Sequence, residues 1–326
     1  MRTPLAEKLP ADPADDPLLR LMRRAASLSD QALHPVEGRG LAYLQAGYPL
    51  HLRGPAGSGK TTLALRLAEK RRRPVMLLVG DANFDTRHLV GSESGMRTRR
   101  VVDRYISSVM KVESETEAVW LDRTLTVACL EGCTLIYDEF NRAPPEANNV
   151  LLTVLEERIL VLPRASRGEC FQRVNPEFRV IFTSNPDDHV GTHSAQDALL
   201  DRMITLDLDC FERDAEVQIV TSRSGLCAQA AGRIVDVVRD LRLSGEYALR
   251  PTLRAALMIA ELARLQNIRV SAEDPRFLEL CYDILASKLK PAAAGGLNPR
   301  VLLERLVQHF CAGPEPAARP AKGARA

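Results

Sequence analysis

The sequence has no long apolar run, no marked excess of charge of one sign and no signal for export. No stretch approaches the roughly 18 apolar residues of a membrane span. The segment 1–17 lacks the apolar core of a secretion signal, so we expect a cytoplasmic protein. With 44 basic and 42 acidic residues the net charge is +2, which is too small to predict nucleic acid or an anionic membrane as the main partner.

Cysteine is also sparse. The 7 cysteines are scattered, and Cys129 and Cys133 form the only close pair. No second pair or nearby histidine completes a zinc set. His189 and His193 lie among turn-forming residues, which favours a loop over a metal-binding helix. We therefore expect buried, reduced thiols.

The length of 326 residues leaves room for about two domains. We predict a loose N-terminal segment at 1–34, an α/β core at 35–211, a helical domain at 212–311 and a disordered tail at 312–326. Five short apolar or β-branched runs alternate with helical patterns, which predicts a parallel sheet covered on both faces. The predicted strands are residues 49–53, 74–79, 133–137, 178–182 and 203–208.

Two sets of helices are predicted around this sheet and after it. A short helix at 39–46 should end at Gly47. Beyond residue 211 the strands stop and apolar residues recur with helical spacing. The four apolar stripes are Ile234, Val237, Val238 and Leu241; Ala255, Met258, Leu262 and Leu265; Leu278, Cys281, Leu285 and Leu289; and Leu302, Leu303, Leu306 and Phe310.

The segment 54–61, Gly-Pro-Ala-Gly-Ser-Gly-Lys-Thr, matches the pattern GxxxxGK[ST] at every fixed position. It follows a predicted strand and precedes a helical pattern at 62–68, as the pattern requires. In such a loop backbone N–H groups and a helix N-terminus face phosphate oxygens. Lys60 should reach the β- and γ-phosphates of ATP, and the Thr61 hydroxyl should bind Mg²⁺. The predicted nucleotide-binding residues are Gly54, Pro55, Ala56, Gly57, Ser58, Gly59, Lys60, Thr61 and Thr62.

A second candidate lies where the strand at 133–137 delivers Asp138 and Glu139 to its carboxyl end. Asp138 should hold Mg²⁺, directly or through water, and Glu139 should polarise the attacking water as general base. Two carboxylates at a strand end are also a common surface feature. The P-loop upstream makes the catalytic interpretation the favoured one.

Three further polar residues are weaker candidates. Asn185 follows the strand run at 178–184, where it either orients the attacking water or only forms a turn with Pro186. Arg202, at the end of a predicted helix at 195–202, and Arg254 are candidates for a guanidinium that stabilises charge on the γ-phosphate. On their own, both arginines are better explained as solvated surface residues.

The segment 138–145, Asp-Glu-Phe-Asn-Arg-Ala-Pro-Pro, resembles the Walker B region of the MoxR branch of AAA+ ATPases. Pro-Glu-Ala-Asn-Asn at 145–149, Phe-Thr-Ser-Asn-Pro at 182–186 and Ser-Ala-Gln-Asp-Ala-Leu-Leu-Asp-Arg-Met at 194–203 are similar to the GvpN family, within the CbbQ/NorQ/GvpN group. The resemblance covers roughly residues 35–290. It implies an AAA+ P-loop core with a parallel sheet and a C-terminal helical lid domain.

The resemblance also implies roles. Asn185 matches sensor 1, and Arg202 matches the arginine finger that acts on the neighbouring subunit. Arg254 best matches sensor 2, with Arg250 as the competing alignment. A finger supplied in trans implies a ring, and we expect a hexamer.

Related rings carry a helical insert and a β-hairpin that face the pore or a partner. Residues 91–96, the basic run 97–104 and residues 160–178 occupy those places here. For the basic run, a solvated helix face is the favoured alternative.

The functional expectation that follows is an ATP-hydrolysing, chaperone-like assembly factor for gas vesicles. Its partners would be its own copies and gas vesicle shell or accessory proteins, and it would associate with the vesicles. One alternative is a CbbQ/NorQ-type ATPase that activates a metalloenzyme or another client. Another is a nucleotide-gated binding module with little turnover, against which Glu139 argues because a switch needs no general base.

Overall fold

The computed structural model describes residues 36–103, 111–162, 171–186, 197–289 and 298–313. The predicted segment 1–34, the histidines at 189 and 193 and nearly all of the predicted tail lie outside these residues. The chain forms two compact units: an α/β unit that ends at Leu208, and a helical unit that starts at Asp209 and also takes in Ala56–Ser58. None of the described helices combines the length and hydrophobicity that crossing a membrane requires.

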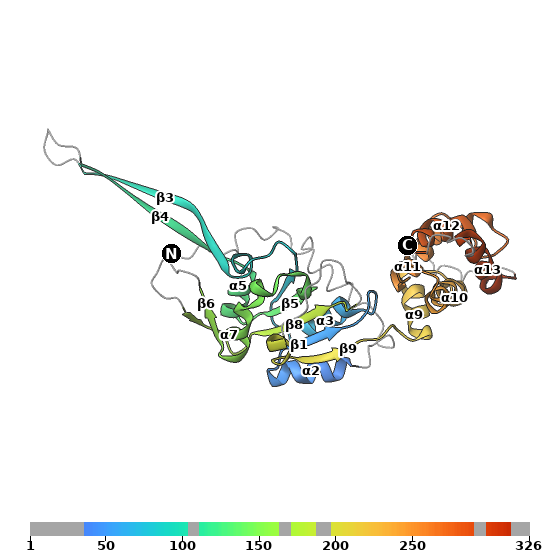
Figure 1. The fold of residues 1–326 in the computed structure, drawn as a ribbon, viewed down its shortest axis with the longest axis horizontal. Helices are drawn as coiled ribbons and strands as arrows, with labels where there is room; N and C mark the ends of the chain where they lie inside the picture. The colour runs from blue at the N-terminus through green and yellow to red at the C-terminus, as the bar shows by residue number, and fades with distance from the viewer. Residues whose placement is uncertain (1–35, 104–110, 163–170, 187–196, 290–297, 314–326) are drawn as a thin grey trace, which may run out of the picture. The chain divides into compact units, whose positions relative to one another are not determined.

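The α/β unit is built on a five-stranded parallel sheet in the order β2–β5–β8–β1–β9 (Figure 1). All five predicted strands are present and all pair in parallel, which confirms the predicted fold class. Their bounds are β1 Leu50–Arg53, β2 Val75–Val79, β5 Thr134–Asp138, β8 Arg179–Ser184 and β9 Ile204–Asp207.

Helices bury both faces of this sheet. On one face Ile136 and Ile181 pack in a cluster with residues of α2 and α3, and on the other Leu135 and Phe182 pack with residues of α5 and α7. Such burial on both sides explains why the strands are continuous apolar runs. The α2 helix ends at Gly47, as predicted, because that residue has a left-handed φ of 101°. The helices are α2 Glu37–Ala46, α3 Lys60–Lys70, α4 Thr86–Val90, α5 Thr124–Glu131, η3 Phe140–Arg142, α6 Pro145–Asn148, α7 Val150–Glu156 and α8 Asp197–Leu200.

Two antiparallel hairpins accompany the sheet. The longer pairs β3 Gly91–Asp103 with β4 Lys111–Asp122 (Figure 1), and the shorter pairs β6 Ile159–Val161 with β7 Phe171–Arg173. The helix expected for the basic run at 97–104 is therefore wrong, because residues 97–103 form a strand. In the backbone register Arg97 lies opposite Glu117 and Arg99 opposite Glu115.

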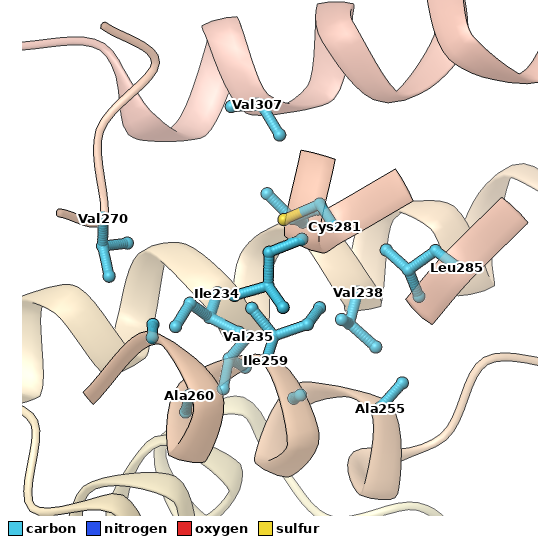
Figure 2. Packing of buried hydrophobic residues seen from close by; sticks show 14 of the residues in the cluster. Ile234, Val235, Val238, Ala255, Ile259, Ala260, Val270, Cys281, Leu285 and Val307 are labelled. Atoms are coloured by element: carbon cyan, nitrogen blue, oxygen red, sulfur yellow. The ribbon is translucent and has the colours of Figure 1, made fainter. Parts of the chain in front are cut away.

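The helical unit packs around one hydrophobic core, in which Ile234, Val235 and Ile259 lie close together (Figure 2). Its elements are α9 Arg213–Ser224, α10 Ala228–Ser244, α11 Leu253–Leu265, α12 Pro275–Leu285, η4 Ala286–Lys288 and α13 Pro299–Cys311. The stripe predicted for α11 is partly wrong, since Met258 is 51% exposed and Leu265 77% exposed. Four of the six buried residues of α11 are alanines: Ala255, Ala256, Ala260 and Ala263, beside Leu253 and Ile259.

Four of the cysteines match the expectation of buried, reduced thiols. Cys129, Cys133, Cys281 and Cys311 are free and buried, and burial raises the pKa of Cys129 to about 12. Cys210 and Cys227 are free but only partly buried, and Cys170 lies outside the described residues. The described residues contain no group of three or more metal-binding side chains.

Candidate active site

Three neighbouring strands bring predicted site residues to one edge of the sheet. β1 leads into Gly54, β8 is followed by Asn185, and β5 ends at Asp138 with Glu139 next. The Gly54 N–H donates to the Ser184 carbonyl oxygen at 3.3 Å, which ties the start of the loop to the end of β8. The structure therefore brings together the P-loop, the two carboxylates and Asn185, which is 7% exposed.

The P-loop has the geometry of an anion cradle. Gly59 has a left-handed φ of 84°, and α3 starts at Lys60 without a side chain that caps its N–H groups. In the part of the chain that the structure describes, the N–H groups of Gly57, Ser58 and Gly59 donate to no backbone carbonyl outside regular helices and strands. Unsatisfied amides at a helix N-terminus are a binding site for phosphate, so these residues fit a nucleotide.

Lys60 lies folded over the loop. Its Nζ donates to the carbonyl oxygens of Gly54 at 2.7 Å and Pro55 at 2.8 Å. The ammonium group is thus held directly beside the free amides, where it is positioned to exchange these carbonyls for phosphate oxygens.

Thr61 and Asp138 face each other. The Thr61 hydroxyl donates to both oxygens of Asp138, with Oγ1 3.0 Å from Oδ1 and 3.1 Å from Oδ2. Mg²⁺ prefers oxygen ligands and is held by one or two carboxylates together with substrate phosphates. This pair of side chains fits a Mg²⁺ ion that arrives with a nucleotide.

The main chain of Glu139 is left-handed, with φ of 54° and ψ of 41°, which is uncommon for a residue with a side chain. Its carboxylate forms an ion pair with Arg142, whose Nε lies 2.8 Å from Glu139 Oε2. Gly80, directly after β2, packs against this turn: its N–H donates to the Asp138 carbonyl oxygen at 2.8 Å. A Cβ on Gly80 would lie 2.2 Å from the Glu139 carbonyl oxygen, so the turn tolerates only glycine there without a shift.

The sequence analysis missed Thr183, whose side chain bridges the two carboxylate residues. Its Oγ1 accepts from the Glu139 N–H at 2.9 Å and donates to Asp138 Oδ1. The strand at 178–184 was predicted, but the contact follows from the pairing of β8 with β5, whose last registered pair, Tyr137 with Phe182, lies one residue before Asp138 and Thr183.

His51 was also missed. Its ring lies between β8 and β9, with Nε2 2.8 Å from Ser184 Oγ and Nδ1 3.1 Å from Thr205 Oγ1. It meets the ring of Phe140 edge-on, with 5.3 Å between centroids. Burial, and then the positive charge of Arg53, lower the pKa of His51 to about 4 against a smaller opposing effect of Asp207. The imidazole is therefore neutral at physiological pH.

Arg202 does not join the site of its own chain. It lies in the turn after α8, which ends at Leu200 and not at residue 202 as predicted, and its Nε lies 2.7 Å from Glu156 Oε2. The Ile204 N–H donates to the Pro49 carbonyl oxygen at 2.9 Å, so this turn lies at the amino end of β1. The P-loop starts at the other end of that strand, about 13 Å away.

Arg254 and Arg250 belong to the helical unit. Arg254 lies in the first turn of α11 and Arg250 three residues before that helix. Both side chains are exposed.

Comparison with known proteins defines the class. Residues 49–203 match the family described as AAA domain (dynein-related subfamily). This stretch contains the P-loop, both carboxylates and four of the sheet's strands in full. Together with the fold, the match identifies residues 49–203 as an AAA domain, of the P-loop ATPase class.

The chain belongs to the GvpN family of gas vesicle ATPases. It is 47% identical over 305 residues to the gas vesicle ATPase GvpN of Ancylobacter aquaticus, which covers 92% of this chain and 85% of that protein. It is 39% identical over 264 residues to the gas vesicle ATPase GvpN of Haloferax mediterranei, covering 80% of this chain and 74% of that protein. The expected family and ATPase activity are thereby confirmed.

A solved structure supports the fold alone. The chain is similar to NtrX from Brucella abortus, solved in complex with ADP, with a TM-score of 0.52 and 14% identity. The similarity covers 90% of this chain and 64% of that one.

Proposed function

We propose that this ATPase promotes gas vesicle formation as a chaperone-like assembly factor that acts on vesicle shell or accessory proteins. The relatives named as gas vesicle ATPases support the process. The observation that carries the chemistry is the pairing of Thr61 with Asp138 beside the P-loop, with Glu139 next in the chain.

Each residue at this edge has a role in the proposal. The amides of 56–61 and the Lys60 ammonium bind the triphosphate, and Lys60 leaves the carbonyls of Gly54 and Pro55 to do so. Thr61 and Asp138 hold Mg²⁺, which supplies charge neutralisation at the β- and γ-phosphates when bound. Glu139 accepts the proton of the attacking water, and Asn185 orients that water.

The remaining roles need a second subunit and the helical unit. Arg202 acts as an arginine finger on the neighbouring subunit of a ring, which we take to be a hexamer. The position of Arg202 at the far end of β1 from its own P-loop supports this proposal. Arg254 acts as sensor 2, with Arg250 as the alternative.

The chemistry is tested by phosphate release from purified protein with ATP and Mg²⁺. We expect Lys60→Ala to lose nucleotide binding. Glu139→Gln should keep its affinity for ATP and lose about 100-fold or more in hydrolysis, since a general base contributes that much. The exposed Glu131→Gln on α5 is the matched control and should hydrolyse at the wild-type rate. Equal rates for Glu139→Gln and wild type would contradict the assignment of the base.

The cellular role is tested by deleting the gene and scoring buoyancy. Complementation with the wild-type gene or with Glu131→Gln should restore floating cells, whereas Lys60→Ala and Glu139→Gln should not. Restored buoyancy with Glu139→Gln would show that vesicle formation does not need hydrolysis. Co-flotation of the protein with isolated vesicles tests the proposed association.

A further inference from the structure

A single buried hydroxyl connects the two residues to which the proposed function gives Mg²⁺ binding and general-base catalysis. Thr183 lies on β8, is 0% exposed and faces the end of β5. Its oxygen accepts the Glu139 N–H at 2.9 Å, and its proton goes to Asp138 Oδ1. A hydroxyl has one proton to donate, and here the carboxylate receives it.

The first contact bears on the backbone of Glu139. A residue with a side chain is strained in the left-handed region and stays there only when its surroundings hold it. The φ of Glu139 is 54°, and its main chain is held on both sides. The Glu139 N–H donates to the Thr183 hydroxyl oxygen, and the Glu139 carbonyl oxygen accepts from the Arg142 N–H at 3.0 Å. The Thr183 hydroxyl therefore helps fix the turn from which the Glu139 carboxylate projects.

The second contact bears on the orientation of Asp138. That carboxylate has two hydroxyl donors in the structure, Thr61 and Thr183. If Thr61 binds Mg²⁺, as the proposed function assigns, its hydroxyl would serve both the ion and Asp138. Thr183 belongs to the sheet rather than to the P-loop, so its hydrogen bond would hold the carboxylate independently of the loop.

We propose that Thr183 is a positioning residue of the ATPase reaction, which fixes the directions of the Asp138 and Glu139 carboxylates without touching the nucleotide. This inference rests on the proposed roles of those two residues. Partners that orient metal ligands in this way change metal affinity or activity by about 10- to 100-fold when removed.

Two comparisons test the Thr183 hydroxyl in the full-length protein: wild type against Thr183→Val, and Thr183→Ser against Thr183→Ala. Thr183→Val replaces it with a methyl group of similar volume. Thr183→Ser and Thr183→Ala both lack the native methyl and differ from each other only in the hydroxyl. We expect kcat to fall about 10- to 100-fold in the Val and Ala variants and to stay within about threefold of wild type in the Ser variant. The affinity for a fluorescent ATP analogue measured without Mg²⁺ should not change.

A second readout does not depend on turnover. Added Mg²⁺ should strengthen binding of the same analogue in wild type and in Thr183→Ser, and should do so at about 10-fold higher concentration in the Val and Ala variants. If Thr183→Val does not fold, the comparison of Ser with Ala decides. A merely structural role predicts lower melting temperatures with kcat and the Mg²⁺ dependence unchanged, and that result would overturn the proposal.

Glu139→Gln in the same assays separates the two levels of the argument. If Glu139→Gln hydrolyses ATP at the wild-type rate, the proposed function of the site fails. If Glu139→Gln is inactive while Thr183→Ala matches Thr183→Ser, only the positioning role of Thr183 fails.

Discussion

At the scale of single residues, Gly80 constrains the turn that carries the proposed general base. A Cβ at this position would lie 2.2 Å from the carbonyl oxygen of Glu139 and 3.0 Å from its carbonyl carbon. Because the obstructing atoms are backbone, Gly80→Ala should displace the Glu139 turn, and a misplacement of about 1 Å can cost about 100-fold in rate. We expect a loss of that order in kcat, with ATP affinity within about threefold of wild type, measured by phosphate release and nucleotide titration.

Gly38→Ala is the matched control, since nothing lies within 4 Å of the position its Cβ would take. That variant should keep the wild-type kcat. Equal kcat values for the two alanine variants would show that the site adapts to the added methyl group.

The buried imidazole of His51 predicts a pH dependence of stability. Its pKa is about 4 in the folded protein and 6.5 when unperturbed, so the unfolded chain binds the proton first as the pH falls. The contribution of the neutral His51 ring to the free energy of unfolding is complete above pH 6.5 and is lost as the pH falls towards 4. Because of this group, a fall from pH 7 to pH 5 should lower the free energy of unfolding by roughly 2 kcal/mol.

Urea unfolding at several pH values checks this prediction. His51→Gln keeps hydrogen-bonding groups without a titratable one, and should remove most of the slope between pH 7 and 5. An unchanged slope would assign the pH dependence to other groups. Arg53 and Asp207 are the charged residues that act on the pKa of the ring.

Which site residues could be predicted from the sequence depended on their spacing along the chain. The loop from Gly54 to Thr61 is contiguous, so its pattern alone predicted a phosphate cradle. Gly80 and Thr183 take their importance from contacts with Glu139, which lies far from both in sequence. Those contacts depend on strand order and register, which no local pattern specifies.

At the scale of elements, a buried ion pair joins α9 to α10 in the helical unit. Glu216 is 2% exposed, and its two oxygens lie 2.9 Å from Arg242 and 3.1 Å from Arg239. Removing one partner of such a pair leaves a buried charge without compensation, which costs about 3–5 kcal/mol. We expect Glu216→Ala to lower the free energy of unfolding by that amount, measured by urea unfolding followed by circular dichroism.

Asp214→Ala, two residues earlier in α9 and with its side chain 90% exposed, is the control. It should change the free energy of unfolding by less than about 0.5 kcal/mol. A Glu216→Ala protein as stable as Asp214→Ala would mean that water or a rearranged side chain compensates Arg242.

Elements were predictable where an apolar pattern was strong, as in the five strands of the sheet. The strand at 97–103 was predicted wrongly because its residues are mainly charged, and their partners on β4 can be identified only once the register is known. The α11 stripe was partly wrong for a related reason. Small alanines lie on the buried face and larger residues such as Leu265 are exposed, so side-chain size did not indicate burial.

At the scale of the whole molecule, the proposed catalytic residues lie at two opposite edges of the sheet, one at each end of β1. The P-loop, Asp138 and Glu139 lie at the carboxyl edge of the sheet, and Arg202 lies at the amino edge. A guanidinium that contacts the γ-phosphate contributes about 10³- to 10⁵-fold in rate. If Arg202 supplies it, the recipient is the site of another subunit, and each complete site contains residues of two chains.

Mixing two inactive proteins tests this arrangement. Arg202→Ala and Glu139→Gln should each bind ATP and fail to hydrolyse it, because one lacks the finger and the other the base. In rings formed at random from equal amounts, about a quarter of the interfaces pair an intact Glu139 with an intact Arg202, so phosphate release should return to a similar fraction of wild type. Lys60→Ala mixed with Glu139→Gln is the control. Both of those changes affect the same half of the site, so no interface in that mixture is complete and activity should stay absent. Failure of the first mixture to recover, with mixed rings shown to form, would mean that Arg202 acts on no neighbouring site.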